Sequence, residues 1–175
     1  MNDPVSANEA LRYRRLSFYA EDVERFNEML ANFLRKANAS CALLIDKEGH
    51  TVAKQGFVEK IDTQSLSALV AGSFASTRQV AKILGEPEFS VLFHQGANQN
   101  IHVTLVGDRT LQVSVFPQNV KTGMIQVLSK ELAEQVLGLL QSIENRSEVE
   151  KPQETLSESF DEEMKDQLDN LFGDL

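Results

Sequence analysis

A long helix predicted between Asp62 and Gly85 constrains the fold of this chain more than any other segment. Asp62 is a favourable N-cap, because its carboxylate accepts hydrogen bonds from the free N–H groups of the first turn. Gly85, followed by Pro87, predicts the end of the helix. An apolar stripe at helical spacing predicts that one side covers a core; it consists of Leu66, Leu69, Val70, Thr77, Val80, Ala81 and Leu84.

The opposite side of this helix is unusually small and flat for an acidic protein, whose solvent faces normally carry Glu and Lys. We interpret it as a contact surface made of Gln64, Ala68, Ala71, Gly72, Ala75, Arg78, Gln79 and Lys82. Gly72 costs about 1 kcal/mol relative to Ala inside a helix, which favours a packing reason for it. The alternative is that the alanines are present only because alanine is the best helix former.

The remaining sequence predicts two further helices and five strands, which alternate with the central helix. In chain order these are a helix at 22–37, strands at 40–46 and 50–55, the helix at 62–85, strands at 88–94, 100–106 and 110–116, and a helix at 123–144. The order is therefore α-β-β-α-β-β-β-α. Helices of this number can cover both faces of one sheet, so the pattern predicts a layered α+β domain at residues 19–144.

Composition excludes several classes of function. The 175 residues fit one domain with tails, and a net charge of −9 disfavours nucleic acid or an anionic membrane as the main partner. With Cys41 as the single cysteine, no internal disulfide is possible and the cytoplasm is the default location. No apolar run has the length of a membrane span.

Both ends of the chain differ from the domain. Residues 1–18 predict a flexible extension with a basic cluster, and residues 145–158 predict a polar linker. Ser159 and Glu162 form a capping box that predicts a C-terminal amphipathic helix at 159–175. The apolar anchors of this helix are Phe160, Met164, Leu168, Leu171 and Phe172. A helix of this kind fits helix-in-groove recognition, with a disordered acidic tail as the alternative.

Catalytic signatures are absent from the sequence, which predicts no metal site and no cofactor. The three histidines occupy separate strands, and His102 lies on the polar phase of its strand, which predicts a surface or interface position. Cys41 is expected to act as a small hydrophobic residue. Arg78 is better explained as an exposed helix arginine than as an arginine finger. The chain is therefore predicted to be an interaction module and not an enzyme.

Several stretches in a fixed order resemble one known family. They are LLIDKEG from Leu43, the helix from DTQSL at Asp62 to AKILGE at Ala81, FHQGA from Phe93 leading into VTLVG at Val103, and the ending DNLF from Asp169. Together they resemble the bacterial Roadblock/LC7 domain, and within it the MglB-type regulators of a Ras-like GTPase. The resemblance extends from about Tyr19 to Ile143 and returns near the C-terminus.

The resemblance implies a five-stranded antiparallel sheet, with the central helix on one face and the terminal helices on the other. Members of the family dimerise by pairing their central helices and neighbouring edge strands. The edge strand here would be the segment Ser90, Val91, Leu92 and Phe93. Pairing of that strand would protect an otherwise open sheet edge.

MglB-type proteins are homodimers that bind an MglA-type Ras-like small GTPase and accelerate its GTP hydrolysis without donating an arginine. In that subgroup the C-terminal helix contacts the GTPase and affects nucleotide exchange. The resemblance thus implies a cytoplasmic regulator of cell polarity or gliding motility, with concentration at a cell pole and contacts with other polarity proteins as further expectations. The alternative is a non-catalytic scaffold that assembles a polarity or motility complex.

Overall fold

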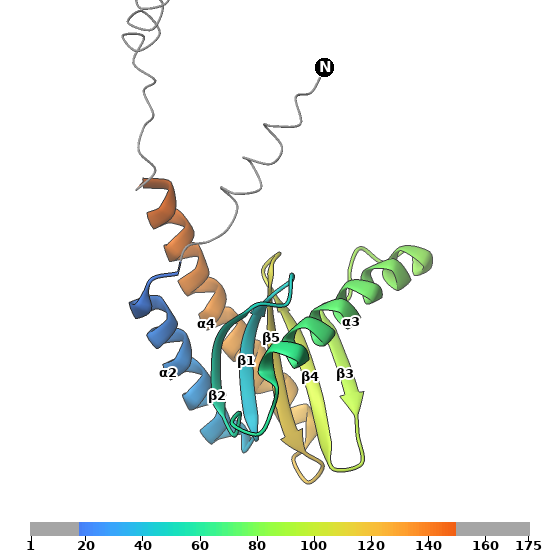
Figure 1. Cartoon of the computed structure of the whole chain (residues 1–175). Helices are drawn as coiled ribbons and strands as arrows, with labels where there is room; N and C mark the ends of the chain where they lie inside the picture. The colour runs from blue at the N-terminus through green and yellow to red at the C-terminus, as the bar shows by residue number, and fades with distance from the viewer. Residues whose placement is uncertain (1–17, 150–175) are drawn as a thin grey trace, which may run out of the picture. The chain divides into compact units, whose positions relative to one another are not determined.

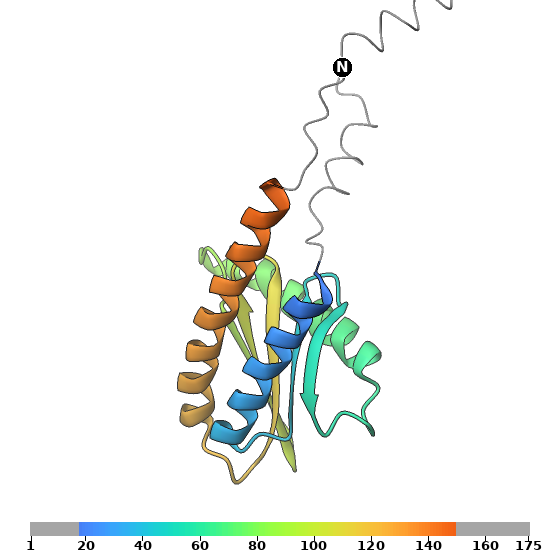
Figure 2. The same cartoon turned by 90° about the vertical axis from the view of Figure 1, so that its left-hand side faces the viewer.

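The computed structural model describes residues 18–149, which contain eight elements (Figures 1 and 2). In chain order they are α2 (Ala20–Ala37), β1 (Cys41–Asp46), β2 (Thr51–Gly56), α3 (Thr63–Leu84), β3 (Val91–Gln95), β4 (Gln99–Val106), β5 (Thr110–Pro117) and α4 (Thr122–Val149). The predicted order α-β-β-α-β-β-β-α is confirmed. The extension at 1–17 and the C-terminal anchors Phe160, Met164, Leu168, Leu171 and Phe172 lie outside the described residues.

The five strands form one antiparallel sheet in the order β2-β1-β5-β4-β3. Helix α3 crosses one face of this sheet, whereas α2 and α4 lie side by side on the other face (Figures 1 and 2). Side chains alternate between the two faces of a strand, so each face has its own apolar core. Strands β2 and β3 are the two edges of the sheet.

The ends of α3 follow the sequence prediction closely. The Asp62 carboxylate accepts hydrogen bonds from the backbone N–H of Ser65 at 3.1 Å and from its hydroxyl at 2.6 Å. These hydrogen bonds lower the pKa of Asp62 because they favour its charged form. Gly85 has a φ of +73°, and the N–H of Glu86 reaches the carbonyl of Ala81 at 2.9 Å, which closes the last turn.

The final helix is longer than predicted. Helix α4 continues to Val149, five residues beyond the predicted end at Glu144, and so occupies the start of the segment predicted as a linker. The strand predicted at 88–94 is observed as β3 at Val91–Gln95. Helix and strand ends are set by local competition between backbone partners, so they are the least certain part of any pattern-based prediction.

Several polar side chains are buried between the sheet and α4, and the sequence analysis did not predict their burial. His102 is paired with Ser114 in the β4–β5 register, and Thr104 is paired with Gln112. His102, Ser114 and Gln112 are all buried, so the prediction of a surface or interface position for His102 is wrong. The physical reason is that α4 covers the face to which the polar phase of β4 and β5 points.

Burial lowers the pKa of His102, and this predicts a fold that is sensitive to acid. Below the unfolded value near 6.5, the unfolded chain binds a proton that the folded chain resists, so the free energy of unfolding falls as pH falls. We expect His102→Gln to lose less stability than the wild type between about pH 7.5 and about pH 5.5. Urea unfolding at both pH values measures this difference.

The matched control is His94→Gln, because His94 is exposed on the edge strand β3. It should retain the pH dependence of the wild type. An identical loss of stability in His102→Gln and the wild type would show that acid acts on other groups.

Candidate protein-protein interface on helix α3 and strand β3

The side of α3 that packs on the sheet is rotated from the predicted stripe. The residues buried on this side are Ser67, Val70, Ala71, Phe74 and Ala81. Ala71 was expected on the contact surface, but it packs in the core with Val70 and Phe74. This expectation for Ala71 is therefore wrong. Phe74 was missed, although a lone aromatic side chain one turn after Val70 is a signal for the core face.

Helix α3 exposes large apolar side chains that were predicted to be core, most of them near its C-terminal end. Leu69 is 70% exposed, and Val80 and Leu84 are also exposed, so their assignment to the core is wrong. Ile83, beside them, is 84% exposed. In Figure 1 the free end of α3 extends past β3, where no sheet lies beneath it. Beyond the edge of the sheet, Ala81 is the residue of the predicted stripe that is still buried, while Val80 and Leu84 are exposed.

The predicted contact residues other than Ala71 all remain accessible. Those that are exposed are Gln64, Ala68, Gly72, Ala75, Gln79 and Lys82. Arg78 is partly buried, and its guanidinium lies 3.2 Å from the carboxylate of Glu88 in the connection to β3. A pair this exposed is worth at most about 1 kcal/mol, so it orients Arg78 more than it stabilises the fold.

Gly72 has no packing reason within residues 18–149. A Cβ atom built at this position would meet nothing within 4 Å. The helical conformation there requires no positive φ either, since Gly72 is absent from the residues with that geometry. The cost of glycine in a helix interior is therefore not repaid by any contact inside the described part of the chain.

Strand β3 presents an open edge next to this helix. It pairs with β4 on one side only, so its outer backbone groups have no strand partner within the sheet. Leu92 points toward the α3 side and packs on that core. Val91 and Phe93 point to the other face and are exposed, with the Phe93 ring 6.3 Å from the ring of Phe116. Ser90, just before the strand, is exposed as well.

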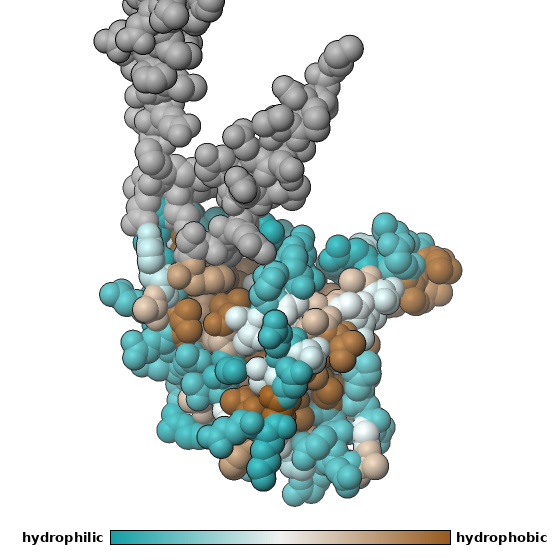
Figure 3. All heavy atoms as spheres, viewed as in Figure 1, coloured by the Kyte–Doolittle hydropathy of each residue, from teal (hydrophilic) through white to brown (hydrophobic). Residues whose placement is uncertain are grey.

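Apolar exposure is concentrated on these two neighbouring elements. Of the ten large apolar side chains exposed among residues 18–149, six belong to α3 and β3. Figure 3 shows hydrophobic side chains gathered at the free end of α3. Scattered apolar residues are normal on a surface, but a group beside an unpaired sheet edge is typical of a protein interface. We call α3 from Ala68 to Leu84, together with Ser90 to Phe93, the α3–β3 surface.

The described residues offer little for catalysis. Burial raises the pKa of the Cys41 thiol, so this cysteine behaves as a small core residue, as predicted. No group of three or more His, Cys, Asp or Glu side chains within residues 18–149 is arranged to hold a metal ion. None of the helices in this part of the chain has the length and apolar character needed to cross a membrane.

Comparison with known proteins agrees with this architecture. The sequence profile of the Roadblock/LC7 domain matches residues 25–114. The chain belongs to the Roadblock/LC7 domain family. Within the family it is similar to Myxococcus xanthus MglB, with 31% identity and a TM-score of 0.69 over 73% of this chain and 96% of that one.

Two further structures extend the comparison. The gliding protein MglB from Thermus thermophilus is 32% identical, with a TM-score of 0.68 over 73% of this chain and 96% of that chain. A Roadblock/LC7 domain from Streptomyces avermitilis is 12% identical, with a TM-score of 0.53 over 69% of this chain and 95% of that chain. This last likeness shows the shared fold alone. A search of curated protein sequences finds no match.

Helix α4 carries a natural control for the role of Gly72. Gly138 is also an exposed helical glycine with open space around its Cβ position. We expect Gly72→Leu to fold but to lose self-association, because a bulky side chain would prevent close approach of a second helix. Gly138→Leu should associate as the wild type does. Light scattering across a concentration series, with thermal unfolding to confirm folding, measures both, and a Gly72→Leu protein that associates normally would contradict the prediction.

Proposed function

We propose that two copies of this chain dimerise through the α3–β3 surface. Leu69, Val80 and Ile83 expose apolar area that a second copy would remove from water, at about 25 cal/mol per Å². Gly72 would allow the two helix backbones to approach closely, and the open edge of β3 would gain hydrogen-bonded partners from its counterpart. The MglB structure described as a tetrameric arrangement, 31% identical to this chain, supports self-association.

We further propose that the dimer regulates a small Ras-like GTPase of the MglA type and accelerates its GTP hydrolysis. The observation that carries this proposal is the α3–β3 surface, found in a chain that is 31% and 32% identical to two MglB proteins over 73% of its length. Such a regulator acts in the cytoplasm on cell polarity or gliding motility. Gln79 and Lys82 on this surface, together with Gln64 one turn before it, would supply hydrogen-bond donors and acceptors for the GTPase.

The mechanism that fits this chain is orientation of the GTPase's own catalytic groups, without a catalytic side chain donated by the regulator. Arg78 is the one arginine on α3, and its guanidinium is held by Glu88 at 3.2 Å. An arginine finger must reach the phosphates of a bound nucleotide, which would require Arg78 to leave that carboxylate. We therefore propose that the regulator orders the catalytic groups of the GTPase itself, since correct orientation alone can supply several kcal/mol of barrier reduction.

Single-turnover GTP hydrolysis by an MglA-type GTPase tests this function. Saturating wild-type protein should raise the hydrolysis rate roughly tenfold or more, which corresponds to about 1.4 kcal/mol of barrier. Ile83→Asp should abolish the increase, because it places a charge in the centre of an apolar contact. Val127→Asp on α4 is the matched control, because Val127 is equally an exposed apolar helix residue outside the α3–β3 surface.

The two variants also separate activation from scaffolding. Binding of the GTPase without any rise in hydrolysis would show that the protein assembles a complex and does not activate. Equal activity of Ile83→Asp and Val127→Asp would remove the α3–β3 surface from the mechanism. The Arg78→Ala variant should keep most of the stimulation of GTP hydrolysis. Complete loss of stimulation in this variant would support an arginine-finger mechanism instead.

The C-terminal segment is proposed as a separate contact with the GTPase. Deletion of residues 159–175 should leave the fold and self-association intact but weaken GTPase binding or change nucleotide exchange. Anchors such as Leu168 and Phe172 contribute roughly 1.5–3 kcal/mol each when fully buried. Calorimetric titration and release of a fluorescent nucleotide measure these effects, and unchanged values for both would exclude the segment from the complex.

A further inference from the structure

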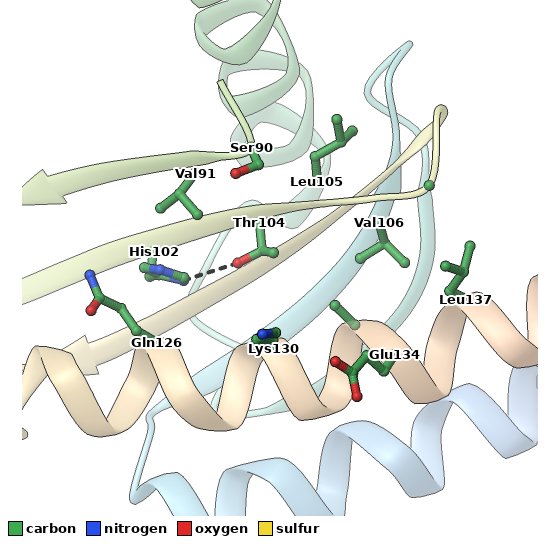
Figure 4. A pocket seen from close by; sticks show the side chains of 12 residues that line it. Ser90, Val91, His102, Thr104, Leu105, Val106, Gln126, Lys130, Glu134 and Leu137 are labelled. Atoms are coloured by element: carbon green, nitrogen blue, oxygen red, sulfur yellow. Dashed lines mark hydrogen bonds between the residues drawn. The ribbon is translucent and has the colours of Figure 1, made fainter. Parts of the chain in front are cut away.

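A cavity opens on the face of the sheet opposite α3, between α4 and the strands β3 and β4 (Figure 4). Its volume is about 480 Å³, within the range of pockets that hold drug-sized molecules. Most of its wall is apolar and comes from the side chains of Val91, Val106, Ala133 and Leu137. It is separate from the α3–β3 surface except for Ser90 and Val91, which contribute to both.

One wall of the cavity contains a buried polar group with unused bonding capacity. His102 is only 1% exposed, and its Nδ1 atom lies 3.3 Å from the hydroxyl of Thr104. Its Nε2 atom has no hydrogen-bond partner among residues 18–149. An unpaired buried ring nitrogen destabilises the fold, and a bound molecule with a suitable polar group would supply the missing hydrogen bond.

The charge around the cavity favours a neutral ligand. On the α4 side, Lys130 and Glu134 contribute opposite charges one helical turn apart, and both side chains reach the solvent (Figure 4). Their fields largely cancel over the opening, so neither an anion nor a cation gains net attraction. Burial lowers the pKa of His102, so its ring is neutral near pH 7 and adds no charge.

We propose that this cavity binds a small, uncharged molecule with an apolar body and a hydroxyl group. The apolar body would cover the side chains of Val91, Ala133 and Leu137, and the hydroxyl would bond to Nε2 of His102. A hydroxyl suits this nitrogen because it donates or accepts, whichever tautomer the contact with Thr104 selects. Water in the cavity would leave the apolar wall hydrated, whereas an apolar body would cover it.

A ligand in this position would touch both α4 and the edge of the sheet. Val91 belongs to β3, and Ala133 belongs to α4, so occupation would hold these elements together. A molecule that binds only the folded state raises its stability by mass action. The proposal does not depend on the GTPase, because the cavity lies across the sheet from α3.

The test uses the full chain and three probes of equal length: 1-octanol, octanoate and octylammonium. With 1-octanol we expect a saturable change in the ¹⁵N chemical shift of His102 Nε2 and a rise in the midpoint of thermal unfolding. Octanoate and octylammonium should bind at least tenfold more weakly. Binding of either ion as tightly as the alcohol would overturn the assignment of a neutral ligand.

Variants locate the binding to the cavity. Ala133→Leu fills it from the α4 side and should reduce 1-octanol affinity at least tenfold, while Ala31→Leu on α2, also at a half-buried alanine, should not. Unchanged affinity in Ala133→Leu, or no shift of His102 Nε2, would overturn the proposal. Binding that appears only after deletion of residues 159–175 would assign the cavity to the chain's own C-terminal segment instead.

Discussion

The packing of Phe74, Val70 and Ala71 against the sheet decides which side chains of α3 remain on the surface. These three residues place the helix in one rotational setting over the core formed with β1, β4 and β5. The side that each residue of the helix faces follows from that setting, because side chains of a helix are regularly spaced around its axis. Leu69 is exposed because it lies on the side of α3 away from Phe74, and Ile83 also lies beyond the edge of the sheet.

The α3–β3 surface arises from the length of α3 relative to the sheet it covers. A sheet of five strands ends at β3, whereas the helix continues to Leu84. The overhang and the adjacent unpaired edge create two kinds of unsatisfied surface at one place, apolar area and free backbone groups. A second copy of the same chain can satisfy both, because a two-fold axis brings like elements together.

The opposite face of the sheet has a different character, since α4 covers polar as well as apolar side chains. His102 and Gln112 are held in the interior there, and His102 Nε2 and Gln112 Oε1 lack partners among the described residues. Apolar residues at these positions would give a more stable fold, because unpaired buried polar atoms are destabilising. Both faces thus depart from a purely structural pattern, as the proposed dimer and the proposed ligand would require.

The element order, the fold class and both ends of α3 could be predicted from the order of residues alone. These features depend on local rules: alternation in strands, capping by Asp62, and the left-handed residue Gly85. The burial of Ala71 and His102 and the exposure of Leu84 required the folded structure. Periodicity shows that a helix or strand has two sides, but burial depends on which neighbouring element covers each side and how far it extends. Here α4 covers the polar side of β4, and α3 extends past β3 at the edge of the sheet. The spacing of residues along the chain predicts neither arrangement.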